Sequence, residues 1–449
     1  MPLSPARAAA FDILLRLERE SSYASELLHS STHERLSTLD HALATELVMG
    51  VLRWRSRLDA DIATASSQPL SKLDLEILVA LRLALYQFRW LDRVPQRAAL
   101  HESVELVKRA RKRSAGPFVN AVLRKLSGTS RAREVKEEET SSPEALAQAF
   151  AHSQWLVERW TQEYGLSAAH RICQHNQTVP ATSIRLRTPG AERHLSQEGI
   201  TLAPGSLLAS ARRVEAGDIT KTQAFRNGDA VIQDEASQLV AALVRDGSQI
   251  LDCCAAPGGK TLAIADHNPT AAITAVELHP HRARLLQKLL HVHPSQSSRI
   301  QIVTADAQHL PVSRQFGCVL ADVPCSGTGT LARNPEIKWR LTLDDLAELA
   351  KRQLAILRSA LAQVAPGGRL IYSTCSLERE ENENVVEQAL SENHSFRLLD
   401  CRTELVRLQA AAELTCPDPA WLTRGAYLRT IPGIHPGDGF FAAILERLQ

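Results

Sequence analysis

The sequence predicts a multidomain protein: an all-α helical bundle, then a small α+β module, then an α/β domain built on a doubly wound parallel sheet. Two patterns lead to this fold class. The first part of the chain repeats apolar residues at helical spacing, and the last part alternates short apolar runs with amphipathic stretches. The chain has 449 residues and a hydrophobic fraction of 44%, enough for two or three domains with sizeable cores.

The first predicted domain, residues 1–128, is an all-α bundle. Between residues 8 and 127 apolar stripes recur at spacings of three and four, and the alternation typical of strands is absent. One such stripe consists of Leu78, Leu81, Leu85 and Phe88.

The N-terminal part is more basic than the chain as a whole. Residues 1–130 contain 19 Lys and Arg against 14 Asp and Glu, a balance of +5, whereas the whole chain has a formal charge of +2. A dense basic run at 108–113 admits two interpretations. It is either the solvated end of a helix or a surface that faces RNA.

A polar stretch separates this bundle from the rest of the chain. Residues 129–142 have almost nothing to bury, and we interpret them as a linker. The segment 143–173 returns to helical spacing, 182–187 alternates as a strand does, and 228–232 resembles a short strand. Together these features predict a small α+β module over residues 143–232.

The remaining residues, 233–449, alternate strand and helix signals, which is typical of a parallel, doubly wound sheet. Strands are expected at 250–253, 272–276, 300–304, 318–321 and 369–373, and helices at 282–290, 343–363 and 380–390. The segment 440–445 could add an antiparallel strand at the end of the chain.

Two cysteines stand in short polar strings directly after predicted strands. Cys325 lies in Asp-Val-Pro-Cys-Ser-Gly-Thr-Gly (322–329) and Cys375 in Tyr-Ser-Thr-Cys-Ser (372–376). A single cysteine after a strand is often simply buried. Two of them at neighbouring carboxyl ends, where ligands of α/β proteins gather, favour covalent catalysis.

The other cysteines are interpreted as structural thiols. No C-x-x-C pair and no His/Cys spacing suited to zinc occurs in the sequence, so no metal site is predicted. The thiols without a predicted catalytic role are Cys173, Cys253, Cys254, Cys318, Cys401 and Cys416.

A glycine-containing loop after the first strand of the sheet predicts a cofactor site. It fits neither G-x-G-x-x-G nor the P-loop spacing, so nothing here cradles phosphates. A plain turn would explain Pro-Gly-Gly alone, but Glu277 and Asp306 end the next two strands and could bind a ribose and an adenine amino group. S-adenosylmethionine fits best, and the predicted loop residues are Cys254, Ala255, Ala256, Pro257, Gly258, Gly259 and Lys260.

The motifs together resemble a known family. The strings Gln-Asp-Glu-Ala-Ser-Gln-Leu (233–239), Asn-Pro-Glu-Ile-Lys-Trp (334–339) and Gly-Asp-Gly-Phe-Phe (437–441), with the cofactor loop and both cysteine strings, are similar to those of Sun-type RNA cytosine-5 methyltransferases. This resemblance covers residues 143 to the end. The helical N-terminus, especially 93–124, resembles NusB, an RNA-binding fold.

The resemblance implies a Rossmann-like, S-adenosylmethionine-dependent domain that methylates C5 of cytosine through a covalent adduct. Cys375 would attack the base, Cys325 would aid release, and Asp322 would contact the base near N3 and lie against the cofactor. Lys260 would lie near the reacting base. A NusB-like domain on such an enzyme implies 16S ribosomal RNA, naked or partly assembled, as the substrate.

Two rival functions stay open: methylation of transfer RNA, and a non-catalytic RNA-binding or assembly factor. The N-terminus lacks a signal peptide, and no apolar run reaches membrane-spanning length. We therefore expect a cytoplasmic protein with reduced thiols and no membrane partner. A monomer is favoured, although the sequence leaves the oligomeric state open.

Overall fold

The computed structural model describes residues 3–20, 22–28, 30, 36–128, 140–292, 297–311 and 315–449. The chain divides into two compact units. Unit 1 comprises Met1–Val179 with Leu331–Arg340, and unit 2 comprises Pro180–Thr330 with Leu341–Gln449. Residues 129–139 of the predicted linker lie outside the described residues. The finer division into four parts stays a prediction.

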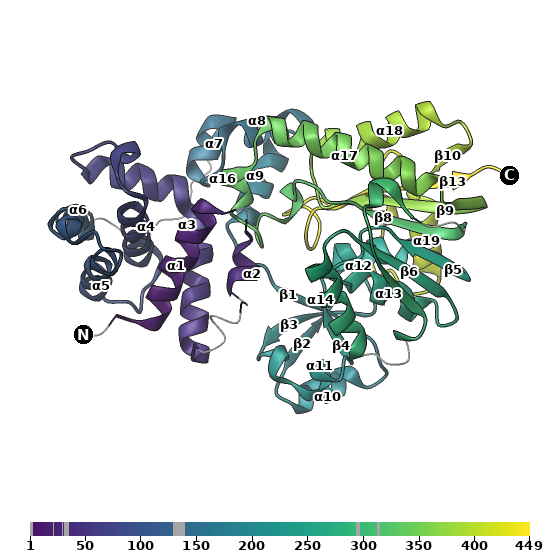
Figure 1. Cartoon of the computed structure of the whole chain (residues 1–449), viewed down its shortest axis with the longest axis horizontal. Coiled ribbons are helices and arrows are strands. Elements are labelled where there is room, and N and C mark those ends of the chain that lie inside the picture. The colour runs from purple at the N-terminus through teal and green to yellow at the C-terminus, as the bar shows by residue number, and fades with distance from the viewer. Residues whose placement is uncertain are drawn as a thin grey trace. The chain divides into compact units, whose positions relative to one another are not determined.

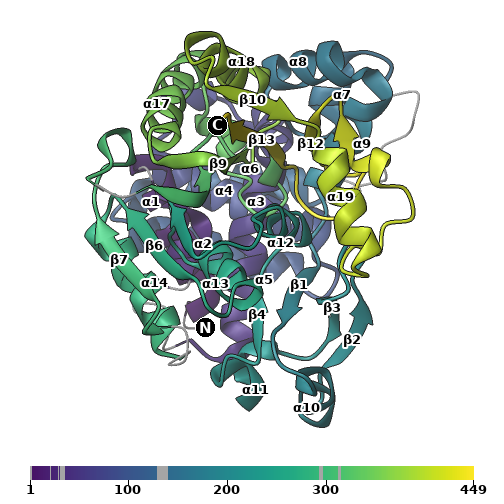
Figure 2. The ribbon, with the colours of Figure 1, turned by 90° about the vertical axis from the view of Figure 1, so that its right-hand side faces the viewer.

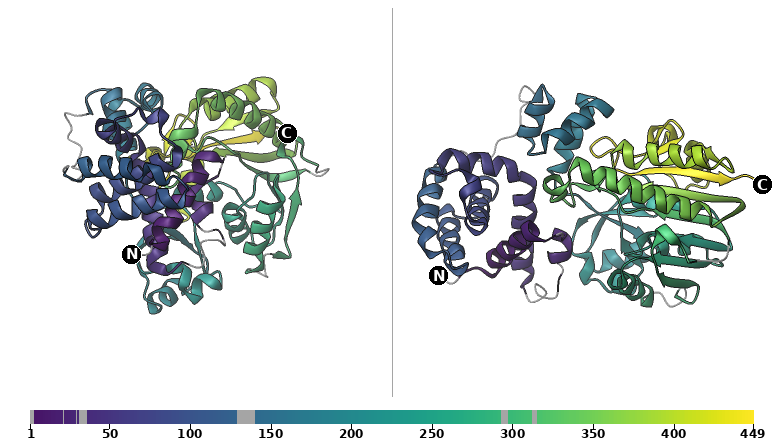
Figure 3. Two further views of the ribbon diagram at one scale, coloured as in Figure 1. Left: turned by 60° about the vertical axis from the view of Figure 1, so that its left-hand side comes forward. Right: turned by 45° about the horizontal axis from the view of Figure 1, so that its top comes forward.

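Unit 1 is helical throughout its described part, as the spacing of apolar residues predicts; its residues up to 179 are purple to blue in Figures 1 and 3, and α16 is green. The Ser37 side chain caps its longest helix by accepting a hydrogen bond from the Asp40 amide at 3.1 Å. Apolar side chains of α1 to α6 form one continuous core. The helices are α1 (Pro5–Arg19), α2 (Ala24–Leu28), α3 (Thr38–Ala65), α4 (Leu75–Trp90), α5 (Gln96–Arg109), α6 (Gly116–Ser127), α7 (Pro143–Ala149), α8 (Gln154–Tyr164), α9 (Leu166–Asn176) and α16 (Ile337–Arg340).

The segment Leu331–Arg340, which contains α16, belongs to unit 1 although it follows the Cys325 string in sequence. Lys338 is fully buried, and its ammonium group donates to the carbonyls of Arg53 at 2.8 Å and Ala151 at 2.9 Å. The Trp339 indole donates to the Leu52 carbonyl at 2.7 Å. Burial lowers the pKa of Lys338 well below its usual range. This segment is therefore an integral part of the packing of unit 1.

Unit 2 begins with a four-stranded antiparallel sheet of order β2-β3-β1-β4. The strands predicted near 182–187 and 228–232 are confirmed, whereas the other two strands and both helices of this part were not predicted. The elements are β1 (Thr182–Leu186), α10 (Ala191–Gln197), β2 (Thr201–Pro204), β3 (Ala211–Ala216), α11 (Gln223–Arg226) and β4 (Ala230–Ile232).

The second sheet of unit 2 has the order β11-β12-β13-β9-β8-β5-β6-β7, with β10 paired to β13. Its strands are β5 (Gln249–Asp252), β6 (Ala272–Glu277), β7 (Ile300–Thr304), β8 (Phe316–Asp322), β9 (Val364–Thr374), β10 (Phe396–Leu399), β11 (Thr423–Arg424), β12 (Tyr427–Arg429) and β13 (Phe441–Arg447). Strands β5 to β9 are parallel, and β13 runs antiparallel to β9. All five predicted parallel strands and the added antiparallel strand are confirmed.

Helices cover both faces of this sheet (Figure 2). Successive residues of one strand enter opposite cores, as Ile250 and Leu251 of β5 do. The helices are α12 (Glu235–Ala242), α13 (Gly259–His267), α14 (Pro280–His291), α17 (Leu343–Leu361), α18 (Glu383–Glu392) and α19 (Cys401–Ala410). Side chains of α12, α13, α14 and α19 join one core, and those of α17 and α18 join the other. The predicted doubly wound, Rossmann-like domain is thus confirmed.

Three of these helices, α14, α17 and α18, were predicted from sequence. In the predicted helix 380–390, the first residues form a 3-10 turn, η7 (Arg379–Glu381), before α18 begins. Within the described parts of the chain, no helix has the length and apolarity needed to cross a membrane.

Candidate active site

Five parallel strands bring the predicted site residues to one edge of the large sheet. In the order β9-β8-β5-β6-β7, each strand ends in a residue of interest or is followed by one within two positions. From β9 to β7 these residues are Cys375, Asp322, Asp252, Glu277 and Asp306. The fold therefore places the two predicted halves of the site, the thiols and the cofactor loop, along one edge.

The two thiols predicted to act together are in contact. Cys325 Sγ lies 3.2 Å from Cys375 Sγ, and the Cys375 backbone amide donates to the Cys325 sulfur at 3.3 Å. Both cysteines are free and half-buried. The hydrogen bond to Cys375 and burial raise the pKa of Cys325 well above its usual range, so Cys325 is a protonated thiol at neutral pH.

The cysteines interpreted as structural have a different setting. Burial raises the pKa of the Cys253, Cys254, Cys318 and Cys401 thiols. Cys173, Cys253, Cys318, Cys401 and Cys416 are all buried. A buried, protonated thiol is inert, which agrees with giving these residues no role in the chemistry.

A buried carboxylate that the sequence did not single out holds the two cysteine strings together. Glu381 is fully buried in η7, and it accepts hydrogen bonds from the Ser326 amide and from Gln353 Nε2, each at 2.8 Å. The hydroxyl groups of Ser326 and Ser376 also donate to it. Gln353 in turn donates to the Pro324 carbonyl at 3.0 Å. One side chain thus fixes the residue after each cysteine.

Close backbone packing adds to this junction. The Gly329 amide donates to the Cys375 carbonyl at 2.9 Å, and the Gly439 amide donates to the Gly329 carbonyl at 2.8 Å. A Cβ at Gly329 would lie 2.2 Å from the Gly439 carbonyl oxygen. Only glycine fits there.

Asp322, at the end of β8, forms an ion pair with Lys260, at the start of α13. The Lys260 ammonium lies 2.7 Å from Asp322 Oδ2, and the Ser373 hydroxyl donates to Oδ1. Burial alone would lower the pKa of Lys260, but Asp322, with a smaller contribution from Cys375, raises it above its usual value. Lys260 also lies 4.9 Å from the centroid of the Phe440 ring. The structure therefore places a fixed cation beside both Asp322, the acid predicted to contact the base, and Cys375, the candidate nucleophile.

The predicted cofactor loop turns sharply after β5. The Ala255 amide donates to the Val276 carbonyl at 2.8 Å, and the Arg282 guanidinium donates to the Ala256 carbonyl at 3.1 Å. Gly258 adopts φ +115°, and a Cβ there would lie 2.5 Å from Leu286. These contacts fix the loop backbone at the edge of the sheet.

Three acids at the ends of β5, β6 and β7 match what a nucleoside needs. Glu277 is buried and accepts the His279 amide at 2.9 Å with one oxygen, and Asp306 accepts the Gln308 amide at 2.9 Å. Asp252, which the sequence interpretation passed over, accepts the Thr261 hydroxyl at 2.7 Å, and its Oδ1 has no partner among the described residues. Asp252 could have been predicted as a site residue, because it ends its strand as Glu277 does. A buried acceptor with a free oxygen beside two further acids fits a ligand rich in hydroxyl and amino donors.

Asp252 is expected to make the folded protein less stable as the pH rises. Burial raises its pKa from an ordinary value of 3.8 to about 6, so its favourable contribution is complete below about pH 4 and is lost as the pH rises through 6. The shift corresponds to about 3 kcal/mol. We predict that urea unfolding from pH 5 to 8 shows a weaker pH dependence in Asp252→Asn than in the wild type. The exposed Asp344→Asn variant should follow the wild type, and parallel profiles for Asp252→Asn would refute the assignment.

Two arginines, one in β1 and one just after it, share one carboxylate. Arg185 is buried, with its guanidinium 2.5 Å from Asp266 on α13. Arg187 contacts the same carboxylate at 2.6 Å. Together they fix the helix that follows the cofactor loop.

Comparison with known proteins matches both parts of the chain. The model of the NusB family matches residues 4–128, and that of 16S rRNA methyltransferase RsmB/F matches residues 240–446. A probable ribosomal RNA small subunit methyltransferase B of Bacillus subtilis is 32% identical, with both chains covered in full. That of Synechocystis is also 32% identical, over 98% of this chain and 99% of its own.

Solved structures share the fold. The crystal structure of PH0851 superposes with a TM-score of 0.80 at 24% identity, covering 100% of this chain and 99% of its own. NSun6 from Pyrococcus horikoshii, solved with SFG, superposes with a TM-score of 0.54 at 19% identity, covering 65% of this chain and 97% of its own. Because relatives of about one-third identity align along its whole length, the chain belongs to the RsmB/F family of 16S rRNA methyltransferases, in the form that begins with a NusB domain.

Proposed function

We propose that this protein methylates C5 of a cytosine in 16S ribosomal RNA through a covalent bond between Cys375 and C6 of the base. The observation that carries the proposal is the contact of 3.2 Å between the Cys375 and Cys325 sulfurs at the ends of adjacent strands. Two reduced thiols in contact, next to a carboxylate–ammonium pair, suit a reaction in which a carbon–sulfur bond forms and then breaks.

Cysteine addition is needed because C5 of cytosine is a poor nucleophile. The Cys375 thiolate adds to C6, the C5–C6 electron pair moves to C4–C5, and the C4–N3 pair moves onto N3, which takes up a proton. C5 is then the nucleophilic carbon of an enamine and can take a methyl group. When bound, S-adenosylmethionine, the donor of this family, would supply that methyl group from its sulfonium sulfur, whose bond to the methyl carbon breaks, and would leave as S-adenosylhomocysteine. The ammonium of Lys260, which interacts with Cys375, would stabilise the thiolate before it attacks.

Asp322 is placed to receive the base. Its carboxylate would accept a hydrogen bond from the exocyclic amino group, and from N3 once addition has made that nitrogen basic and protonated. The ion pair with Lys260 and the bond from Ser373 fix the carboxylate before the base arrives. Such preorganised groups need no rearrangement at the moment of reaction.

Cys325 would act when the product leaves. After methyl transfer the C5 proton passes to solvent, the C5–C6 double bond re-forms, and the Cys375 sulfur departs as a thiolate. Because the Cys325 thiol stays protonated at neutral pH, it can donate a hydrogen bond to that departing sulfur. Its role is thus to make Cys375 a better leaving group.

The residues along the sheet edge fit S-adenosylmethionine. Glu277 would bind the ribose hydroxyls, and Asp306 would bind the adenine amino group. The backbone of the loop 254–259 would lie along the cofactor, and Asp322 would lie against its methionine end. The free Asp252 Oδ1 gives a further acceptor next to the loop.

The test is to incubate the protein with labelled S-adenosylmethionine and, separately, deproteinised 16S rRNA, assembled small subunits and tRNA, and then to map 5-methylcytosine. We expect label at a cytosine of 16S rRNA. Label on tRNA alone would mean that the substrate is tRNA and not 16S rRNA. Label at another atom would contradict methylation of cytosine C5. No label on any RNA would favour a non-catalytic RNA-binding or assembly factor.

Glu381→Gln is expected to slow methyl transfer without weakening cofactor binding, because Glu381 positions the residues beside both thiols. The Ser326 and Ser376 hydroxyls now donate to a carboxylate oxygen of Glu381. In the variant the Gln side chain would place an NH2 donor at that position. We predict a fall in kcat of about 10- to 100-fold and a loss of about 1–3 kcal/mol in unfolding free energy. The KM for S-adenosylmethionine should stay within about twofold. The exposed Glu387→Gln is the matched control, and an unchanged kcat in Glu381→Gln would exclude the positioning role.

A further inference from the structure

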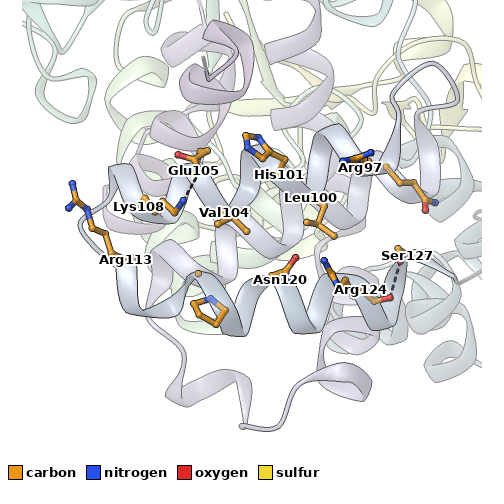
Figure 4. Close-up of a pocket in the computed structure, with 13 residues that line it drawn as sticks. Arg97, Leu100, His101, Val104, Glu105, Lys108, Arg113, Asn120, Arg124 and Ser127 are labelled. Atoms are coloured by element: carbon orange, nitrogen blue, oxygen red, sulfur yellow. Dashed lines mark hydrogen bonds and ion pairs between the residues drawn. The ribbon is translucent and has the colours of Figure 1, made fainter. Parts of the chain in front are cut away.

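We propose that the groove between α5 and α6 binds the phosphate backbone of the substrate RNA without reading its sequence. The inference rests on the proposed function, since it takes RNA as the substrate. Figure 4 shows the groove, a cavity of about 930 Å³ between two helices that run side by side. Leu100 and Val104 of α5 supply apolar lining, as Figure 4 shows. Pro117, at the start of α6, also lines the groove.

The rim of this groove carries guanidinium groups without acidic partners. Arg97, Arg113 and Arg124 are exposed, and none of them forms an ion pair with any residue in the described ranges. Several arginines elsewhere on the surface of the same unit are neutralised, although Arg93 and Arg111 are exposed and also form no ion pair within the described ranges. Examples of neutralised arginines are Arg16 with Glu20 at 2.9 Å, Arg19 with Glu76 at 2.5 Å and Arg109 with Asp12 at 2.7 Å. Positive charge is therefore left uncompensated at the groove.

The local charge balance favours an anionic ligand. The one acid that lines the groove, Glu105, is paired with Lys108 at 2.7 Å, so the three arginines leave about +3. In Figure 4, Arg97 and Arg124 lie toward one end and Lys108 and Arg113 toward the other. Helix α5 has 14 residues, about 21 Å, so the rim can follow several nucleotides of a single strand.

The chemistry of the lining favours backbone contacts over base recognition. A guanidinium group matches phosphate oxygens with two parallel hydrogen bonds. Sequence-specific RNA recognition commonly stacks unpaired bases on aromatic side chains, and none of the residues that line the groove is Trp, Tyr or Phe. Phosphate contacts give affinity and orientation that do not depend on sequence.

The basic run at 108–113 is therefore not the RNA surface as a whole. Three of its five cations are paired, Lys108 with Glu105, Arg109 with Asp12 and Lys112 with Asp74. Of the run, Lys108 and Arg113 line the groove, and only Arg113 of these two is unpaired; the other two groove arginines come from the start of α5 and from α6.

The test compares two triple variants of the full-length protein that remove the same charge. Arg97→Gln, Arg113→Gln and Arg124→Gln together empty the groove rim; Arg16→Gln, Arg19→Gln and Arg109→Gln together remove paired arginines as the control. Binding of a deproteinised 16S rRNA fragment is measured by filter binding between 50 and 200 mM salt. We expect the groove variant to bind about 10- to 100-fold more weakly, with the salt slope reduced by about two to three, and the control to change by less than about threefold. An RNA of scrambled sequence should lose the same factor.

The outcomes separate the groove from the function. Equal losses in both variants would overturn the proposal, because charge alone would then explain binding. Unchanged RNA binding in the groove variant, with lost binding of polyglutamate, would overturn it in favour of an acidic protein partner. If the wild type methylated no RNA at all, the proposed function would fail, while selective loss of RNA binding in the groove variant would still support the groove.

Discussion

Replacing Cys375 with Ala is expected to lower methyl transfer to 16S rRNA by about 10,000-fold or more. Without the sulfur no bond to C6 forms, and C5 stays too weak a nucleophile to take the methyl group. The fold should survive, because Cys375 is half-buried and its carbonyl, which accepts the Gly329 amide at 2.9 Å, is kept. The measurement is initial rate with labelled S-adenosylmethionine, accompanied by thermal unfolding.

The matched control is Cys416→Ala, which removes a buried thiol that contacts the Asp418 carbonyl rather than the site. It should keep the wild-type rate within about twofold. Residual activity of Cys375→Ala above about one per cent would mean that the carbon–sulfur bond is made elsewhere or not at all.

Replacing Cys325 with Ala is expected to have the opposite effect on the intermediate: a covalent protein–RNA adduct should accumulate. Cys375 would still add to C6 and C5 would still take the methyl group, but the departing sulfur would lose the thiol that lies 3.2 Å from it. We expect turnover to fall by about a thousandfold, with about half or more of the protein trapped on methylated RNA.

The adduct can be seen as a band on a denaturing gel that RNase treatment shifts, and mass spectrometry of the remaining nucleotide should find it on Cys375. The double variant Cys325→Ala with Cys375→Ala should give no adduct. An adduct in Cys375→Ala but none in Cys325→Ala would exchange the roles of the two thiols.

The large sheet could be predicted because its strands are short apolar runs, and parallel strands buried on both faces leave that pattern. The same reasoning failed for β3, whose sequence Ala-Arg-Arg-Val-Glu-Ala reads as a charged loop. This segment is a strand because its backbone pairs with β1 on one side and β2 on the other. The small strands β11 and β12 are likewise set by their neighbours rather than by their own residues.

The site divides in the same way. The placement of Cys375, Glu277 and Asp306 at one edge of the sheet could be predicted, because topology fixes where strand ends lie. Glu381 could not, since it sits in a run of acids that looks like a solvated surface, and only tertiary packing against Ser326 and Gln353 buries it. Groups that act through hydrogen bonds across distant segments leave no periodic signal in the sequence.

The ten residues Leu331–Arg340 constrain how this protein can be recombined with its relatives. Because they pack in unit 1, the chain crosses between the units three times, and unit 1 is not one continuous stretch of sequence. A chimera that exchanges only residues 1–179 would pair Lys338 and Trp339 with foreign carbonyl positions in place of those of Arg53, Ala151 and Leu52. An N-terminal domain from another family member should therefore be transplanted together with its own version of this segment, as a two-piece cassette.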